Sequence, residues 1–306
     1  SSDLNEQPKA KNGQIGLFSE TYEKLQLKSS DKITASKTEK PISIDYIKAK
    51  LEGKKLTANQ IEAIIKDVVE DNFTDVELTY FVSGAYLNGL DDEETVNLTK
   101  SIVKNGQQIR FTEGKIMDKH CIGGVPGNRT TMVVIPIITA ANLKMPKTSS
   151  RSITSPAGTA DTMECLANVT IPAPTLKKIA NKYNGFIAWG GGVDIASADD
   201  HIIKVRHPLS LDPEGMMLAS IMAKKFAVGS TDVLIDIPWG ENVKVKTVQQ
   251  ANHLKKRFEK IGKKLGMNVK VIETDGSQPI GNGIGPMLEA IDVLKVLENK
   301  EDAPKI

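Results

Sequence analysis

The chain has 306 residues, with 40 lysines and arginines against 38 aspartates and glutamates, so its net charge is only +2. This balance argues against a protein that binds nucleic acid through charge, and two cysteines, Cys121 and Cys165, are too few for a disulfide scaffold or a four-cysteine zinc site. The longest apolar run, residues 132–138, is too short for a membrane helix of ~20 residues, and Ser1 opens no secretory signal, so we expect a soluble, cytoplasmic protein.

The first forty residues differ from the rest of the chain. Residues 1–40 are rich in lysine, serine, glutamate and asparagine, and their scattered leucines and isoleucines follow no sustained period. A segment of this composition buries too little apolar surface to form a packed core. We therefore expect a polar tail or the remnant of an upstream domain.

Helical patterns follow over residues 41–110. The segments 57–60 and 74–77 have the sequence of a capping box, in which a threonine and a glutamine or glutamate three residues later satisfy free amides at a helix start. Behind the first segment, the apolar residues of 61–69 form an amphipathic stripe, and residues 91–105 form another predicted helix. Because the connections are short, we predict a small all-helical domain.

From Phe111 onward, short β-prone runs alternate with helical patterns. The predicted strands are residues 115–118, 145–148, 186–189, 233–237 and 269–273, and the predicted helices are residues 128–142, 159–166, 174–183, 248–265 and 286–299. Strands that alternate with helices imply right-handed crossovers and a mostly parallel sheet with helices on both faces.

The sequence therefore predicts an α/β protein of two domains. Residues 196–228 are helical and interrupt the α/β pattern, so we expect them to return to the first helices. The helical domain then comprises residues 41–110 and 196–228. The α/β domain, which we expect to bind phosphate, comprises residues 111–195 and 229–306.

A glycine-rich loop follows the first predicted strand of the α/β region. Residues 118–130 read DKHCIGGVPGNRT, so that a strand runs into a loop with three glycines and then into a helix. Free amides and the dipole at that helix start favour an anion, the glycines allow close approach of a ligand, and Lys119 adds a point charge. The spacing matches neither a Walker loop nor a dinucleotide fingerprint. A plain glycine turn with Lys119 in solvent is an equal alternative on spacing alone.

A second loop, residues 149–164, reads SSRSITSPAGTADTME and follows another predicted strand. Six hydroxyl-bearing residues and one arginine occur within residues 149–159. Hydroxyls both donate and accept hydrogen bonds, so this segment can hold phosphate and sugar oxygens together. Helix capping by Thr159 is the alternative, but the density of hydroxyls favours a binding role.

The two loops together resemble those of the nucleoside phosphorylase family, which includes thymidine, pyrimidine-nucleoside and AMP phosphorylases. The KH-x-x-GG pattern of residues 119–124 is similar to the phosphate loop of that family, and the S-x-R…GT-x-D-x-x-E pattern of residues 149–164 is similar to its signature. The run over residues 148–164 is closest to the AMP phosphorylase-like branch, which includes bacterial chains assigned as thymidine phosphorylases. The resemblance covers residues 41–306 and implies the two-domain fold of these phosphorylases.

The resemblance also implies a set of site residues. Those implied to bind phosphate are Lys119, Gly124, Thr130, Ser149 and Thr159. Those implied to bind the substrate are Ser150, Arg151, Ser152, Ile153, Thr154, Ser155, Arg206, Ser220, Lys224 and Lys244. The catalytic residues that it implies are Asp212, as the acid that protonates the leaving base, and His120, near the phosphate or the base.

Some of these residues also have structural explanations. Asp212 precedes Pro213, a combination typical of a helix N-cap followed by proline at the first helical position. Lys244 is equally consistent with a solvated surface lysine, and His120 with a structural histidine. Ser220 and Lys224, by contrast, are four residues apart on one predicted helix, so both can point at one ligand.

Neither cysteine nor metal chemistry is expected at this site. Cys121 stands where many thymidine phosphorylases have a serine that contacts phosphate, and a thiol is a poor hydrogen-bond donor. A nucleophilic pair with His120 is not expected, because adjacent residues of a strand point to opposite faces. No cluster of histidine, aspartate or glutamate has metal-ligand spacing. We therefore predict no metal and no cofactor, with inorganic phosphate as a co-substrate.

The resemblance implies phosphorolysis of an N-glycosidic bond, in which phosphate attacks the anomeric carbon and a free base and a pentose 1-phosphate result. Residues 121–122 look like those of the bacterial chains assigned as thymidine phosphorylases, so we predict that thymidine and phosphate give thymine and 2-deoxyribose 1-phosphate. The hydroxyl-rich segment 150–155 favours the AMP-like branch instead. A nucleoside 5′-monophosphate such as AMP, giving ribose 1,5-bisphosphate, is therefore the alternative substrate.

Two further alternatives concern the activity itself. Family members continue beyond the position that matches Ile306, so we expect a sheet that is incomplete at the C-terminus, and a non-catalytic nucleotide-binding fragment is one alternative. A phosphoribosyltransferase of similar plan would need magnesium and an acidic diphosphate-binding pattern, which the sequence lacks. As partners we expect a small-molecule nucleoside or nucleotide and phosphate, with no nucleic acid polymer and no membrane. The resemblance implies a homodimer, and we expect the two domains to close over the reactants.

Overall fold

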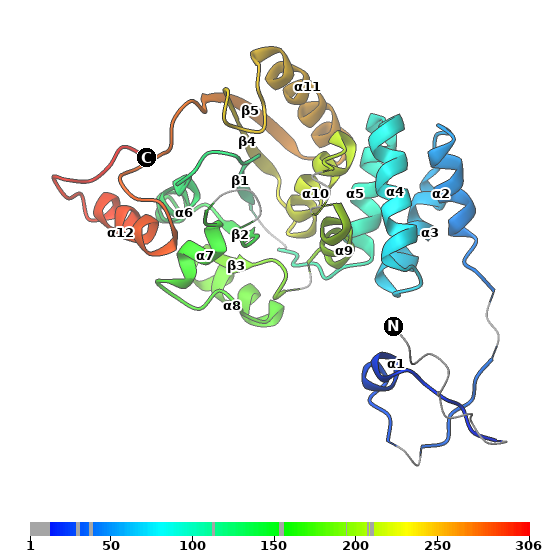
Figure 1. Cartoon of the computed structure of the whole chain (residues 1–306). Coiled ribbons are helices and arrows are strands. Elements are labelled where there is room, and N and C mark those ends of the chain that lie inside the picture. The colour runs from blue at the N-terminus through cyan, green and yellow to red at the C-terminus, as the bar shows by residue number, and fades with distance from the viewer. Residues whose placement is uncertain are drawn as a thin grey trace, which may run out of the picture. The chain divides into compact units, whose positions relative to one another are not determined.

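The computed structural model divides the chain into two compact units, residues 1–40 and residues 41–306. It describes residues 13–28, 31–36, 39–111, 114–152, 156–193, 195–206, 208 and 211–306. In the described part of the first unit there is one short helix, α1 (Ser19–Lys24), and the apolar side chains beside it are exposed, as Phe18 and Leu25 show. All elements below belong to the second unit (Figure 1).

Four helices open the second unit. They are α2 (Ser43–Leu51), α3 (Ala58–Val69), α4 (Asp75–Asn88) and α5 (Asp92–Lys104). Both predicted capping boxes are confirmed: the Thr57 amide donates to the Gln60 side chain at 2.9 Å, and the Thr74 amide donates to Glu77 at 3.0 Å. Such caps each contribute about 1 kcal/mol. The predicted stripe of α3 is buried in the core that these helices share.

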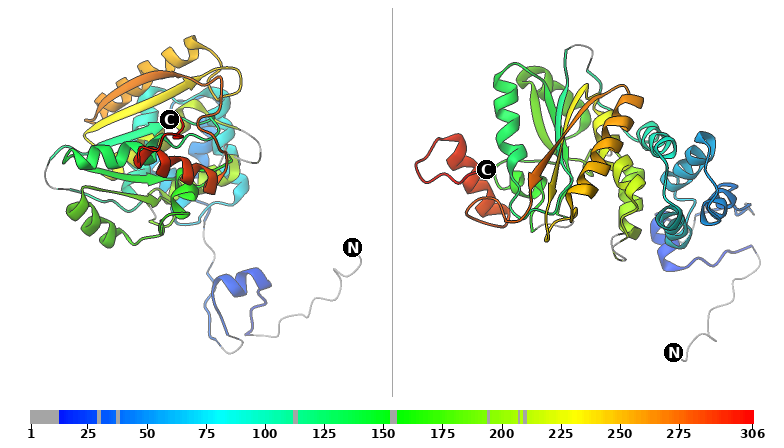
Figure 2. Two further views of the ribbon diagram at one scale, coloured as in Figure 1. Left: turned by 90° about the vertical axis from the view of Figure 1, so that its left-hand side faces the viewer. Right: turned by 90° about the horizontal axis from the view of Figure 1, so that it is seen from above.

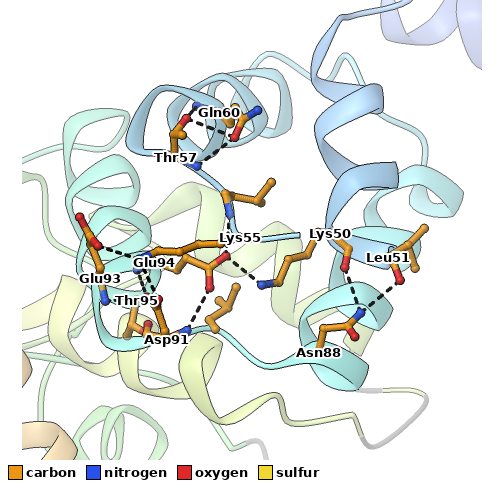
Figure 3. Close-up of polar contacts among 12 residues, drawn as sticks. Lys50, Leu51, Lys55, Thr57, Gln60, Asn88, Asp91, Glu93, Glu94 and Thr95 are labelled. Atoms are coloured by element: carbon orange, nitrogen blue, oxygen red, sulfur yellow. Dashed lines mark hydrogen bonds and ion pairs between the residues drawn. The ribbon is translucent and has the colours of Figure 1, made fainter. Parts of the chain in front are cut away.

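A buried ion pair links α2 to α5 (Figure 3). The Lys50 Nζ lies 2.8 Å from Glu94 Oε1, and both side chains are only 3% exposed. The same carboxylate accepts the Leu56 amide at 2.9 Å and, through its second oxygen, the Asp91 amide at 3.0 Å. With these bonds the buried charge is both paired and hydrogen-bonded, as a charge in a core must be.

Two later helices pack against this group. α9 (Ser197–Arg206) contacts α3, α4 and α5, and α10 (Glu214–Ala227) contacts α4 and α5. Figures 1 and 2 show α10 between the helical group and the strands. Its buried Ala219 and Ala223 belong to the helical core, whereas Leu218 and Met222 belong to the core under the sheet. α9 and α10 thus adjoin the first helices, while the division of this unit into two domains stays a prediction.

Five strands run parallel in the α/β part of the described chain. They are β1 (Met117–Cys121), β2 (Met145–Ser149), β3 (Gly185–Trp189), β4 (Asp232–Trp239) and β5 (Asn268–Asp275). β4 pairs with both β1 and β5, with His120 opposite Ile235, and β2 pairs with β3. The combination of a helical part and a parallel α/β part confirms the predicted fold class.

The predicted single sheet is split between β1 and β2. The two pieces meet through one parallel bridge, Ile116 with Lys144, before the strands separate. Beyond the bridge the Lys147 Nζ, on β2, donates to the Lys119 carbonyl of β1 at 2.5 Å. A buried side chain therefore occupies the place where backbone pairing would continue, and the carboxyl ends of β1 and β2 are left apart.

Helices pack against both pieces of the split sheet, whereas alternate residues of β5, such as Lys270 and Ile272, are exposed. α11 (Val248–Lys264) packs its buried Leu254, Phe258 and Ile261 on the alternate apolar residues of β4 and β5. α6 (Thr130–Ala140) and α8 (Ala173–Tyr183) contact β3, and α7 (Thr159–Glu164) and α12 (Pro286–Leu297) lie with them. α12 lies at the end of the unit opposite α2 (Figures 1 and 2). None of the helices in the described residues has the length and apolar character that a bilayer span requires.

Candidate functional site

A cavity of about 200 Å³ lies where the carboxyl ends of β1 and β2 face α9 and α10. The glycine-rich loop contributes residues 122–125, and the hydroxyl-rich loop contributes residues 149–151 and 157–159. Parallel strands present their carboxyl ends at one edge of a sheet, which is where ligands bind in α/β folds. The fold thereby brings the two predicted anion-binding loops to one site.

Most of the residues predicted to bind ligands line this cavity. They are His120, Gly124, Ser149, Ser150, Arg151, Thr159, Arg206, Ser220, Lys224 and Lys244. Four others do not line it, namely Lys119, Thr130, Ser152 and Asp212. The predicted residues Ile153, Thr154 and Ser155 lie outside the described residues.

The placement of Lys119 follows from the extent of β1. The strand covers Met117–Cys121, whereas residues 115–118 were expected, so Lys119 and His120 belong to the strand and point to opposite faces. His120 faces the cavity, and the Lys119 Nζ lies 3.5 Å from the buried carboxylate of Asp236. Lys119 therefore lies behind the cavity wall and contributes charge rather than a lining surface.

Thr130 begins α6, and its hydroxyl donates to the Asn128 side chain at 2.9 Å. Its neighbours in the chain, Asn128 and Thr131, line the cavity instead. At Gly124 the backbone is left-handed, with φ of 98°, and a Cβ there would come within 2.8 Å of the Lys244 amide. Glycine thus allows the segment that carries Lys244 to approach the loop.

The acidic residues of the hydroxyl-rich loop hold its shape. Arg151 donates to Asp161 at 3.0 Å and to Glu164 at 2.6 and 2.9 Å, and its guanidinium stacks over Trp189. Burial raises the pKa of Asp161, but hydrogen bonds from the Gly158 and Ser152 amides and from Arg151 outweigh it and lower that pKa. Ser152 consequently lines a smaller adjoining cavity, beside Trp189, rather than the main one. The carboxylates therefore fix the curvature of the loop and orient its arginine.

The far wall of the cavity is built by α9 and α10. The Ser220 hydroxyl donates to Asp199 at 2.6 Å, and the Lys224 Nζ lies 2.6 Å from the same carboxylate oxygen. The spacing of four residues predicts that Ser220 and Lys224 point at one place. In the structure both side chains contact Asp199, and both residues line the cavity. Asp199 is the anchor that the sequence analysis missed, since a carboxylate inside a helix carries no local signal of such a role.

Asp212 lies between two cations at the edge of the cavity. Its carboxylate oxygens are 3.1 Å from Arg206 Nη1 and 3.0 Å from Lys244 Nζ. The N-cap explanation is wrong, because α10 has Pro213 at its N-cap and no side-chain cap. The carboxylate instead lines a second cavity of about 660 Å³, which shares Ile122, Met217 and Lys244 with the first.

The cavity is strongly electropositive at its His120 end. Burial, followed by the charges of Lys225, Lys147, Lys224 and Lys119, lowers the pKa of His120 well below its ordinary value. An imidazole in this field is neutral at physiological pH, so it can accept or donate a hydrogen bond without adding charge. Burial, with the Asp236 charge, raises the pKa of Cys121 to about 11, so the thiol beside the loop stays protonated.

Two lining residues escaped the sequence analysis although they adjoin the hydroxyl-rich loop. Lys147 and Thr148 precede Ser149 on β2, and both line the cavity. Their only sequence signal is a lysine and a threonine directly before the hydroxyl-rich loop. Within the described residues the buried Thr148 hydroxyl has no hydrogen-bond partner, which is unusual for a buried polar group and suits a ligand contact. The described residues contain no group of three or more metal-ligating side chains.

Comparisons with known proteins agree with this architecture. A family model described as "Glycosyl transferase family, helical bundle domain" matches residues 44–106, and one described as "Glycosyl transferase family, a/b domain" matches residues 113–211. Among solved structures, anthranilate phosphoribosyltransferase from Thermus thermophilus is similar with a TM-score of 0.67, covering 85% of this chain and 84% of that one. At 14% identity this likeness concerns the fold alone.

Curated relatives are closer in sequence. The "Putative thymidine phosphorylase" of Polaromonas sp. is 45% identical over 291 residues, which are 95% of this chain and 57% of that protein. The "AMP phosphorylase" of Methanospirillum hungatei is 45% identical over 293 residues, which are 96% of this chain and 57% of that protein. The chain thus spans a little more than half the length of the relatives it matches.

Proposed function

The chain belongs to the glycosyl transferase family, in the group of proteins named as thymidine and AMP phosphorylases, and we propose that its site catalyses phosphorolysis of a pyrimidine nucleoside. Thymidine and inorganic phosphate would give thymine and 2-deoxyribose 1-phosphate. One observation carries the proposal: a single electropositive cavity joins two anion-binding loops to the Ser220 and Lys224 wall of α10.

The loops supply the phosphate site in this proposal. The glycine-rich loop at Gly124 and the start of α7 at Thr159 offer backbone amides, and Ser149 adds a hydroxyl. A phosphate oxygen forms a bond to the anomeric carbon while the bond from that carbon to the base nitrogen breaks. Positive charge develops on the sugar, so the bound phosphate acts both as nucleophile and as counter-charge.

The α9 and α10 wall supplies the base site. Arg206, Ser220 and Lys224 lie within the cavity, where donors can meet the negative charge that builds on the base. The leaving nitrogen takes a proton, and Asp212 is the proposed donor. Because Arg206 and Lys244 now contact its carboxylate, we infer that the substrate displaces these cations, and that the freed carboxylate takes a proton from water and passes it to the leaving nitrogen.

The loops that position the reactants are expected to contribute more to the rate enhancement than the proton donor does. A positioned proton donor contributes ~10²–10⁴-fold, whereas enzymes lower their barriers by ~8–23 kcal/mol in total. Holding two reactants in line can supply about 7–11 kcal/mol. In this proposal no metal or cofactor takes part, the substrates are small molecules, and the protein acts in the cytoplasm as a homodimer.

The second candidate function is phosphorolysis of a nucleoside 5′-monophosphate. Relatives of both names match the chain at the same level of identity, and Lys244 lies at the border of the two cavities, where it can meet an additional phosphate. Burial of a second phosphate would require this further cation. Both candidates break the N-glycosidic bond with phosphate. Thymidine has a 2-deoxyribose with a free 5′ hydroxyl, whereas a nucleotide such as AMP has a ribose with a 5′ phosphate and a different base.

A substrate profile separates these functions. The full chain is incubated with phosphate and either thymidine, uridine, AMP or CMP, and free base and sugar phosphate are measured by chromatography, with a phosphate-free reaction as control. We expect phosphate-dependent release of thymine at the highest rate. A preference for the monophosphates would replace the proposed substrate, and binding without base release would support a non-catalytic nucleotide-binding role.

A further inference from the structure

Three buried charges lie directly behind the cavity. The Asp118 carboxylate of β1 is 3.2 Å from the Nζ of Lys147 on β2 and 2.9 Å from the Nζ of Lys225 on α10. Their side chains are at most 4% exposed. This group therefore connects two strands and a helix in a part of the molecule with little access to water.

The charges of this group are unequal. Two other buried ion pairs of the described residues, Lys50–Glu94 and Arg129–Asp292, each match one cation with one carboxylate. Asp118 instead faces two lysines, and the nearby His120 adds no negative charge, because burial and then the lysine charges lower its pKa. Buried charge is costly unless it is paired. When both lysines are protonated, the group therefore carries one positive charge more than Asp118 can neutralise.

Only one of the two lysines reaches the ligand space. Lys147 lines the cavity between His120 and Thr148, whereas Lys225 does not line it. Lys225 alone suffices to pair with Asp118 at 2.9 Å. The unmatched cation is therefore the one that borders the space between the two anion-binding loops.

We propose that Lys147 is a further phosphate-binding residue, whose ammonium group contacts the oxyanion while Lys225 keeps Asp118 neutralised. This inference rests on the proposed function, because it places the phosphate of that reaction in the main cavity. An anion beside Lys147 supplies the missing negative charge, and Thr148, whose buried hydroxyl has no partner within the described residues, lines the same cavity. The proposal also explains why β1 and β2 separate at this point, since a closed sheet would leave no path for the side chain.

The burial of the Lys147 side chain beside the empty cavity supports this assignment. Burial and the Lys225 charge lower the pKa of Lys147 to about 7 although Asp118 opposes them. A lysine whose charge is penalised in the empty cavity gains most when an anion arrives. A lysine with a purely structural role would be charged and fully paired before any ligand bound.

Isothermal titration with phosphate and with sulfate tests the proposal on the full chain, independently of catalysis. In Lys147→Met we expect the affinity for both anions to fall by roughly 10- to 100-fold, as for a lost charge-assisted contact, with a melting temperature no lower than that of the unchanged protein. The absence of thermal loss follows because Asp118 and Lys225 remain a matched pair. Lys147→Arg should keep most of the affinity.

Lys144→Met is the matched control, since it removes the same charge from the other end of β2, where the side chain contacts Asn181 and Phe111. We expect it to bind both anions like the unchanged protein. Unaltered anion affinity in Lys147→Met would overturn the proposal. Loss of cooperative unfolding in this variant would also overturn it, because the proposal requires a lysine that folding does not need. Anion binding by a chain that releases no base would overturn the proposed function and leave the Lys147 assignment intact.

Discussion

Asp212 shows how the role of a residue depends on partners that are distant in the chain. Its neighbour Pro213 favours an N-cap, but the carboxylate is drawn to Arg206 and Lys244. An N-cap bond contributes about 1 kcal/mol, which two cations at a cavity edge can outweigh. The family resemblance identified Asp212 as a candidate site residue, whereas the local sequence indicated an N-cap and gave no information about these partners.

The Asp212→Asn variant tests the proposed proton donor. We expect turnover to fall by ~10²–10⁴-fold while phosphate affinity stays nearly unchanged, because the amide keeps the shape but donates no acidic proton. Steady-state kinetics and phosphate titration measure the two effects separately. Asp275→Asn, at the exposed end of β5, is the control, and loss of phosphate binding in Asp212→Asn would indicate a structural role.

The pH dependence of sulfate binding follows from the shifted groups of the cavity. Sulfate does not titrate near neutrality. The pKa of His120 lies far below its usual value, so the imidazole stays neutral. The pKa of Cys121 is about 11, so the thiol stays protonated. Lys147, whose pKa is about 7, is then the group that changes charge. Its ammonium group contacts Asp118 and the Lys119 carbonyl of β1, with Lys225 of α10 beside it, and Lys224 of α10 lines the same cavity.

The sign of this dependence is fixed by linkage. The protonated lysine binds the anion, so affinity is highest below pH 7 and falls as the pH rises through the pKa of the empty site, by up to about tenfold per unit. Titration calorimetry from pH 6 to about 9 measures it. In Lys147→Met the dependence should disappear, and an affinity that rises with pH in the unchanged protein would contradict the assignment.

The two loops could be predicted at the residue scale because their chemistry is local. Glycines, hydroxyls and a helix start within one short segment are compatible with an anion site, although a plain glycine turn explained the first loop equally well. Lys119 and Lys147 could not be told apart in this way. Which of two strand lysines borders a ligand depends on the side to which each points and on where β1 and β2 separate, and both are properties of the packed sheet.

At the scale of elements, α12 connects the two helices that begin at the cavity. Arg129, at the start of α6, donates to Asp292 of α12 and to the Gly127 and Ile280 carbonyls at 2.7 and 3.0 Å. The Thr162 hydroxyl of α7 donates to Glu289 of α12 at 3.3 Å. α12 therefore positions the N-termini of α6 and α7 relative to each other.

Asp292→Asn breaks the stronger of these connections. Arg129 is completely buried, and removal of one partner of a buried pair costs about 3–5 kcal/mol. We expect a loss of unfolding free energy of that order in urea denaturation, together with weaker phosphate binding because the glycine-rich loop loosens. Asp302→Asn is the control. It removes the exposed ion-pair partner of Lys295, which lies on α12, and it should change neither the unfolding free energy nor the phosphate affinity. Normal stability in Asp292→Asn would show that the connection contributes little.

Elements were predicted more accurately than their connections. The capping boxes of α3 and α4 and the apolar stripe of α3 were evident because each depends on residues within a few positions. The ends of β1 were misplaced, since its last residues carry polar side chains that resemble a loop. The contact of Arg129 with Asp292 joins residues far apart in the chain, and no local pattern indicates it.

At the scale of the whole second unit, the cavity is formed by parts with different cores. The loops belong to the sheet, and the Ser220 and Lys224 wall belongs to α10, which also packs on the first helices. Such a site can exclude water by closing over its reactants. The sequence indicated a helical pattern and an α/β pattern. The splitting of the sheet at Lys147 could be recognised only in the packed structure.

Closure is testable by small-angle scattering. We expect the radius of gyration to decrease when phosphate and a nucleoside analogue are added together, and to change little with either alone, because both halves of the site must be filled. The Asp212→Asn variant is suited to this measurement since it should bind without turnover. Identical scattering profiles under all conditions would argue for a preformed site.

The central claim is that the two loops together hold an oxyanion below the sugar. A crystal structure of the full chain with phosphate tests it most directly. The account predicts one phosphate between the backbone at Gly124 and the start of α7 at Thr159, within contact of Ser149 and Lys147. Phosphate bound elsewhere, with both loops empty, would contradict it.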